Sequence, residues 1–110
     1  MMKIGKMFSS GDIVLAKVQF TDTFEIKKRP VLILFEDHNN VIVAGITSNT
    51  EMKGIMLSKN DGLIKNSVIK LNYIFTISSM MLEKKLCSLN VNKRKEVHNS
   101  LIKKLNILIE

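Results

Sequence analysis

The hydrophobic and polar positions near the start of the chain alternate with the short period of a β-strand. Within residues 12–20, DIVLAKVQF, every second side chain from Val14 to Phe20 is apolar, and Lys17 and Gln19 fall between them. Alternation of this kind is typical of a strand that buries one face and exposes the other. We therefore expect a half-buried strand here.

The next two apolar runs do not alternate. Residues 30–36 and 41–48 are short, β-branched and apolar almost throughout, which indicates strands covered on both faces. The turn-forming residues 37–40, DHNN, lie between them, so the two strands are predicted to form a hairpin. Proline cannot donate a backbone hydrogen bond, and Pro30 is therefore expected at the first residue of its strand.

Three more stretches carry strand patterns. Residues 54–62 are predicted to form a strand that enters an Asn-Asp-Gly turn. Residues 66–78 form another long β-branched stretch, and residues 82–89 are compatible with either a strand or a helix.

The period of the pattern changes near residue 90. Asn90 or Asn92 can cap a helix in which apolar residues recur at steps of four, four and three: Val97, Leu101, Leu105 and Leu108. Short strands followed by one amphipathic helix predict a mainly β fold, a small barrel closed by a C-terminal α-helix.

The length and composition limit the class of protein. With 110 residues, of which 45% are hydrophobic, residues 1–110 are expected to form a single folded domain. One cysteine permits no intramolecular disulfide, and we find neither an apolar run of about 20 residues nor a signal peptide. We therefore expect a cytoplasmic protein with no membrane association. The sparse carboxylates offer no metal-ligand spacing, and we expect no metal or other cofactor.

The charge adds an indication of partners. Lysine and arginine number 17 against 10 acidic residues, which gives a net charge of +7. A small domain with this excess favours polyanions such as nucleic acid, an anionic membrane or an acidic protein segment. A requirement for solubility, or AT-rich codon usage in a sequence rich in lysine, isoleucine and asparagine, would give the same composition.

One group of residues has the chemistry of a phosphate site. Arg29 precedes the rigid Pro30, and an arginine offers paired planar donors that suit a phosphate. Thr47-Ser48 ends the next strand, and in an antiparallel hairpin the start of one strand lies beside the end of the other. Arg29 and Thr47-Ser48 are therefore predicted to converge on one rim of the barrel, with Glu25 on the loop leading to it.

These side chains suit RNA cleavage through the 2′-hydroxyl of the RNA. That reaction needs the hydroxyl deprotonated, the extra charge on the phosphate stabilised and the leaving oxygen protonated. Arg29 suits the second task, and Thr47, Ser48 and Glu25 suit positioning and proton transfer. The alternative is that Arg29 is a surface charge and that Thr47-Ser48 only caps a strand.

The order of several short motifs resembles the PemK/MazF family of toxins from toxin–antitoxin pairs. The motifs are GDIVLAKVQFTD, KKRPVLIL, VIVAGITS and SVIKLNYIFTIS, followed by the C-terminal helix, over about residues 11–108. The resemblance implies an SH3-like barrel with a C-terminal helix. It also implies a metal-independent endoribonuclease that cleaves single-stranded RNA, including mRNA, and so halts translation.

The resemblance also implies roles for particular residues. The catalytic arginine of the family falls on Arg29 and its catalytic threonine on Thr47, with Ser48 beside it, and an acidic residue of some members falls near Glu25. A cognate antitoxin with an acidic or apolar tail would cover this groove. Further RNA contacts are expected from the surrounding polar residues Lys27, Lys28, Lys17, Gln19 and Asn49.

The chain departs from the family pattern in two places. The first loop reads TDTFEIKK, and Asn72-Tyr73 stands where many relatives carry glutamine, so substrate contacts and target sequence are expected to differ. We also expect a homodimer that uses apolar barrel surface, including Met80-Met81, and part of the C-terminal region. Two other functions stay open, a non-catalytic barrel that binds nucleic acid or protein and a toxin-like fold that acts on a topoisomerase.

Overall fold

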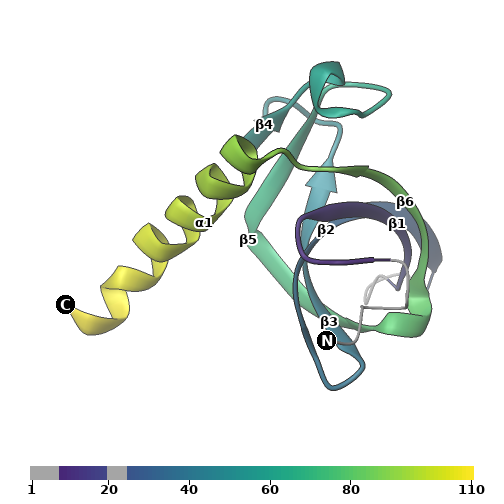
Figure 1. Ribbon diagram of the computed structural model, residues 1–110, viewed down its shortest axis with the longest axis horizontal. Helices are drawn as coiled ribbons and strands as arrows, with labels where there is room; N and C mark the ends of the chain where they lie inside the picture. The colour runs from purple at the N-terminus through teal and green to yellow at the C-terminus, as the bar shows by residue number, and fades with distance from the viewer. Residues whose placement is uncertain (1–7, 20–24) are drawn as a thin grey trace.

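The fold is built on one six-stranded antiparallel sheet, seen in a computed structural model that describes residues 8–19 and 25–110. The strand order is β4-β5-β3-β2-β1-β6 (Figure 1). The strands are β1 (Asp12–Gln19), β2 (Ile26–Asp37), β3 (Asn40–Thr47), β4 (Ile55–Leu57), β5 (Ser67–Ser78) and β6 (Leu82–Ser88). The predicted face position of Phe20 and the Phe-Thr-Asp motif lie outside the described residues.

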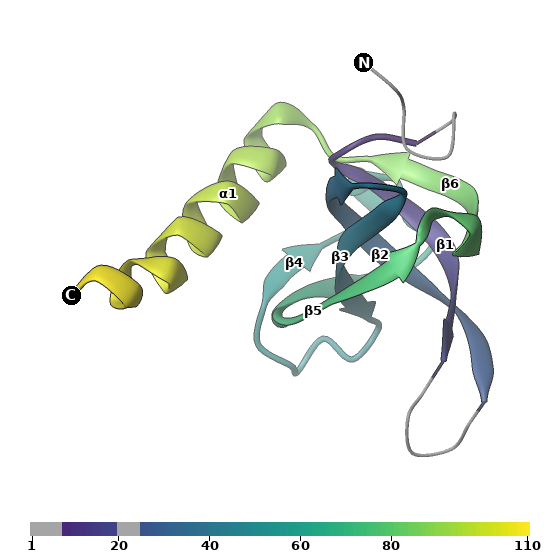
Figure 2. The same ribbon diagram turned by 90° about the horizontal axis from the view of Figure 1, so that it is seen from below.

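The sheet curls into a half-barrel, and the α-helix α1 (Val91–Leu105) follows β6 (Figure 1, Figure 2). This confirms the predicted mainly β fold with a C-terminal helix. Of residues 82–89, which were compatible with strand or helix, Leu82–Ser88 form β6 and pair with β1. Among the described residues, no helix is both long and apolar enough to cross a membrane.

The predicted hairpin of residues 30–48 is confirmed as β2 and β3. They are joined at His38 and Asn39, whose φ angles of 48° and 65° are left-handed. Two consecutive residues with positive φ form the tight turn that matches the twist of a hairpin, and asparagine tolerates this conformation better than most residues.

Two hydrophobic clusters lie on opposite faces of these strands. Neighbouring residues of β2 alternate between them: Val31 and Ile33 belong to one cluster, and Leu32, which lies between them, belongs to the other. All three are almost fully buried, with about 1% of each side chain exposed. This explains the unbroken apolar run, because a strand packed on both faces has no side free for polar residues.

The expectation that Pro30 begins its strand is wrong. Strand β2 begins at Ile26, and Pro30 pairs with Leu15 of β1 inside it. On the other edge of β2, however, the pairing with β3 begins only at Val31. Pro30 therefore comes one residue before the β2–β3 ladder, where its missing N–H costs no hydrogen bond to β3.

The Gly-Asp pair at the start of β1 contacts both β6 and the helix. Gly11 has a φ of +91°, and a Cβ atom there would lie 2.6 Å from Nε of Arg94 on α1. Asp12 is 3% exposed and accepts a 2.6 Å hydrogen bond from the Ser88 hydroxyl at the end of β6. The Arg94 Nε donates to the carbonyl of Leu89 at 2.8 Å, which fixes the start of the helix.

Helix α1 packs against the core of the sheet through Val97 and Leu101. Asn90 is the N-cap, and its side chain accepts from the backbone N–H of Lys93 at 2.8 Å, as the sequence predicted. Val97 is buried and Leu101 packs partly against the same cluster. Leu105 and Leu108 are 55% and 77% exposed, so the periodic apolar face continues beyond the surface that covers it. The helix thus flanks the half-barrel, and its C-terminal end points away from the sheet (Figure 1, Figure 2).

Candidate functional site

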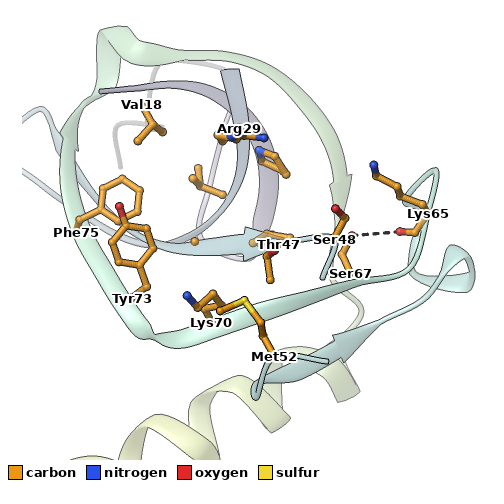
Figure 3. A pocket seen from close by; sticks show the side chains of 14 residues that line it. Val18, Arg29, Thr47, Ser48, Met52, Lys65, Ser67, Lys70, Tyr73 and Phe75 are labelled. Atoms are coloured by element: carbon orange, nitrogen blue, oxygen red, sulfur yellow. Dashed lines mark hydrogen bonds between the residues drawn. The ribbon is translucent and has the colours of Figure 1, made fainter. Parts of the chain in front are cut away.

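The candidate site is a pocket of about 410 Å³ that residues of β2, β3 and β5 line together. Polar side chains enter it from three separate parts of the chain, and Figure 3 shows them around one opening. They are Arg29, Thr47, Ser48, Lys65, Ser67 and Lys70. The residues that line this pocket include three cations and no acidic side chain, so the pocket is electropositive and suits an anion.

The sheet register brings Arg29 and Thr47 together. Val31 of β2 and Gly45 of β3 form the last pair at this end of the ladder, and Arg29 and Thr47 each lie two residues beyond that pair on their own strands. Residues two apart on a strand share a face, so both side chains emerge where the buried Val31–Gly45 pair ends. The predicted convergence of Arg29 and Thr47-Ser48 on one rim is confirmed, since all three line the same pocket.

The Thr47 hydroxyl already has one local contact. Its Oγ1 accepts a 3.1 Å hydrogen bond from the backbone N–H of Asn49, and the side-chain oxygen of Asn49 accepts from the N–H of Glu51 at 3.1 Å. Thr47 therefore does cap the turn after β3, as the alternative interpretation supposed. A hydroxyl that accepts a hydrogen bond still has its own hydrogen to donate, so this contact leaves a donor for a substrate oxygen.

Strand β5 and the segment before it supply pocket residues that sequence reasoning missed. Lys70, Tyr73 and Phe75 come from β5, and Lys65 and Ser67 come from its start. The Ser67 hydroxyl donates to the Lys65 carbonyl at 3.2 Å, which fixes this corner of the pocket (Figure 3). One signal was available in the sequence, because Lys70 is a cation in the middle of a β-branched strand.

Glu25 and Lys27 lie on the hairpin arm beyond the pocket. They form an ion pair of 3.2 Å, and both side chains are about half exposed. Lys27 pairs with Val18 in the ladder and is two residues from Arg29, so it shares the face of Arg29. Neither Glu25 nor Lys27 lines the pocket.

The structure places Lys17 and Lys28 on the other face of the sheet. They pair with each other in the β1–β2 ladder, one position away from Ala16 and Arg29. Both contact Glu83 of β6, at 3.5 and 3.2 Å. The ion pair with Lys28, reinforced by Lys17, holds the pKa of the Glu83 carboxyl below its ordinary value. These two lysines therefore border Glu83 and not the pocket.

The two remaining predicted RNA contacts are exposed near the same end of the sheet. Gln19 is the last residue of β1, and Asn49 belongs to the turn that Thr47 caps. Neither side chain lines the pocket. Of the nine residues predicted from the sequence, the pocket thus gathers Arg29, Thr47 and Ser48.

Comparison with protein families gives one match over most of the chain. Residues 9–105 match the model described as "PemK-like, MazF-like toxin of type II toxin-antitoxin system". No curated protein sequence matches the chain significantly.

Solved structures of the same architecture are similar over nearly their whole length. The Mycobacterium tuberculosis toxin MazF-mt6 is 25% identical, with a TM-score of 0.69 over 86% of this chain and 96% of that chain. A mycobacterial endoribonuclease in complex with its cognate antitoxin is 14% identical, with a TM-score of 0.69 over 90% and 93% of the two chains. A chain of the MazE-MazF complex from Deinococcus radiodurans is 14% identical, with a TM-score of 0.70 over 90% and 96%. The last two likenesses concern the fold alone.

Proposed function

Because the chain belongs to the PemK-like, MazF-like toxin family of type II toxin–antitoxin systems, we propose that it is an endoribonuclease that cleaves single-stranded RNA. The observation that carries the proposal is the electropositive pocket that Arg29 of β2 and Thr47 of β3 line together, just beyond the Val31–Gly45 pair. A mycobacterial relative of the same fold is an endoribonuclease by its own description.

The proposed reaction uses the RNA's own 2′-hydroxyl as the nucleophile. The 2′-oxygen loses its proton and attacks the adjacent phosphorus, and the bond from phosphorus to the 5′-oxygen breaks. The 5′-oxygen takes up a proton, which leaves a 2′,3′-cyclic phosphate on one product and a 5′-hydroxyl on the other. Extra negative charge develops on the phosphate oxygens during attack, and this charge is what the pocket has to stabilise.

Arg29 is assigned to this charge. Its planar guanidinium presents paired donors to two phosphate oxygens, and it projects from a strand whose next residues, Pro30 to Ile33, are held in the sheet. A donor on such a support needs little reorganisation when charge develops, which is the condition for strong stabilisation. Three cations in the pocket supply positive charge without a metal ion, and we therefore propose a metal-independent reaction.

Thr47 is assigned to positioning a phosphate oxygen through its hydroxyl hydrogen. The backbone N–H of Asn49 fixes the direction of the hydroxyl, because its oxygen must face that N–H. Ser48 lines the same pocket and offers a second hydroxyl. Proton transfer by Glu25, which lies outside the pocket beside Lys27, stays a prediction that Glu25→Gln would test.

Incubation of the pure protein with single-stranded RNA in EDTA tests the activity and its metal independence together. We expect internal cleavage, products with a cyclic phosphate, and little cleavage of the same sequence in a duplex. Cleavage that EDTA abolishes and magnesium restores would overturn the mechanism. RNA binding without cleavage under either condition would support the alternative of a non-catalytic barrel.

The same pocket is the proposed docking place of a protein antitoxin. A type II system pairs the toxin with a protein, and an acidic segment would complement a pocket lined by three lysine and arginine side chains. Co-purification of the chain with its cognate antitoxin should suppress RNA cleavage, and Arg29→Ala should weaken the complex. An antitoxin that binds Arg29→Ala as tightly as the unchanged chain would place its docking surface elsewhere.

A further inference from the structure

Strand β5 leaves its regular pairing at the wall of the pocket. Gly45 of β3 pairs with Lys70, but the adjacent Ala44 pairs with Ile74, so three residues of β5 have no partner in β3. They are Leu71, Asn72 and Tyr73. A strand with extra residues bends and re-aims its side chains, and Figure 1 shows the bend in β5. Leu71 stays buried, and Tyr73 lines the pocket.

The Tyr73 ring is supported and still accessible. It lies over Gly45, where a Cβ atom would come within 2.6 Å of the ring's Cδ2. The centroid of the Phe75 ring is 4.8 Å away at an interplanar angle of 36°, so the two aromatic rings support each other. Tyr73 remains 43% exposed, whereas Gly45 next to its ring is buried.

The cation of Lys70 lies over the ring of Tyr73. The Lys70 Nζ lies 5.6 Å from the centroid of Tyr73, and both side chains line the pocket that Arg29 enters (Figure 3). Proteins stack the unpaired bases of single strands on partly exposed aromatic rings beside a basic groove, whose cations contact the backbone.

We propose that Tyr73, supported by Gly45 and Phe75, is a stacking subsite for an unpaired base of the RNA beside the phosphate that Arg29 holds. The inference rests on the proposed function and adds a recognition element to it. Lys70 meets the backbone phosphate next to the stacked base. A base within a duplex is already stacked and paired, so this subsite selects single-stranded RNA. It leaves the choice among bases mainly to other contacts, because every base has a face that can stack.

The composition of the chain makes the subsite directly observable. Tyr73 is the only tyrosine, and the chain has no tryptophan, so tyrosine fluorescence reports on this ring alone. The probe is a short single-stranded oligonucleotide of mixed sequence made of 2′-fluoro RNA, which lacks the attacking hydroxyl. Titration should quench the fluorescence after correction for absorption. An abasic oligonucleotide of the same length and charge should not quench it.

Variants separate stacking from charge and from folding. Tyr73→Leu should bind the labelled 2′-fluoro oligonucleotide about 5- to 100-fold more weakly in fluorescence anisotropy, whereas Tyr73→Phe, which keeps the ring, should stay within about twofold. Gly45→Ala should weaken binding too, since the added methyl displaces the ring. The abasic oligonucleotide should bind the wild-type protein and Tyr73→Leu with equal affinity.

The outcomes distinguish this subsite from the proposed function. One outcome is that the wild-type protein cleaves RNA while its tyrosine fluorescence is not quenched and Tyr73→Leu binds the 2′-fluoro oligonucleotide as tightly as wild type. That result would overturn the subsite and leave the proposed function intact. If Tyr73→Leu weakened binding of the normal and of the abasic oligonucleotide equally, the subsite would also be overturned, because the loss of affinity would then come from a structural change. A chain that neither binds nor cleaves single-stranded RNA would overturn the proposed function and the subsite together.

Discussion

Two surface regions differ in what lies beneath them. One is the pocket rim, formed by Arg29, Thr47 and Ser48, and the other is the helix end, formed by residues 102–109. The rim carries polar groups that adjoin the buried segments of β2 and β3. The helix end carries apolar groups with little beneath them: Ile102, Leu105, Ile107, Leu108 and Ile109 are between 47% and 87% exposed.

This difference separates two roles of exposed residues. A polar side chain on a rigid support can be lost with little effect on folding, because it buries almost nothing, but its loss removes a positioned group. An apolar side chain without cover contributes little to the fold of one chain and is available to a second surface. Substitutions in the two regions should therefore affect different measurements.

Arg29→Lys should give the largest effect. The charge remains but the paired planar donors are lost, so RNA cleavage in EDTA should fall by about 10²–10³-fold. Arg29 is exposed, and the melting temperature should hardly change. Lys59→Arg on the distant 3₁₀ turn η1 (Lys59–Asp61) is the matched control. Near-normal cleavage by a folded Arg29→Lys would show that the Arg-Pro pair serves the architecture alone.

Thr47→Ala should have the next effect on cleavage, about 10- to 100-fold, and a smaller one than Arg29→Lys because Ser48 offers a second hydroxyl in the same pocket. Thr47→Ser keeps the oxygen that accepts from Asn49 and should cleave RNA at a nearly normal rate. Initial rates at saturating RNA provide the measurement. If the alanine and serine variants were equally slow, the methyl group and not the hydroxyl would be what matters.

Comparing Val97→Ala with Leu105→Ala tests whether the buried part of the helix contributes more to stability than its exposed end. Val97 is 6% exposed, and removing its two methyl groups should lower the free energy of unfolding by about 2 kcal/mol. Leu105→Ala removes a larger side chain but should stay within about 0.5 kcal/mol, because Leu105 is 55% exposed. Urea unfolding of both variants in dilute solution compares them. A larger loss for Leu105→Ala would show that a partner covers the helix end.

The smallest expected effect concerns association. We predict a homodimer that uses apolar barrel surface and the helix end, and light scattering at micromolar concentration should give twice the chain mass of 12.5 kDa. Leu108→Asp should raise the dimer dissociation constant at least about tenfold, while Asn99→Asp, which adds the same charge to the polar side of the helix, should not. A monomer in the unchanged chain would contradict the prediction.

The sequence was most informative where one local pattern determined the structure. The turn formers between two apolar runs predicted the β2–β3 hairpin, and the hairpin in turn brought Arg29 and Thr47 to the same pocket. Asn90 followed by a helical period gave the start of α1. Each of these features depends on residues close together in the chain, so short-range rules were enough.

The features that were missed depend on distant parts of the chain. A regular period of two cannot show that β5 carries three unpaired residues opposite β3, and this irregularity is what turns Tyr73 to the pocket. Lys17 and Lys28 looked like neighbours of Arg29, but Glu83, far along the chain, lies between them on the other face. The helical period identified the apolar face that includes Leu105 but not whether another surface covers it.

The bond between Asp12 and Ser88 has a consequence for how the chain folds. The two residues are 76 positions apart, and β1 has no partner on this edge until β6 is available. The hairpins form from near neighbours, whereas this long-range closure must wait, so we expect it late on the folding pathway. Until then β1 exposes an unpaired edge that can pair with other chains. Ser88→Ala should therefore speed unfolding more than it slows folding in stopped-flow measurements, and the reverse would place the closure early.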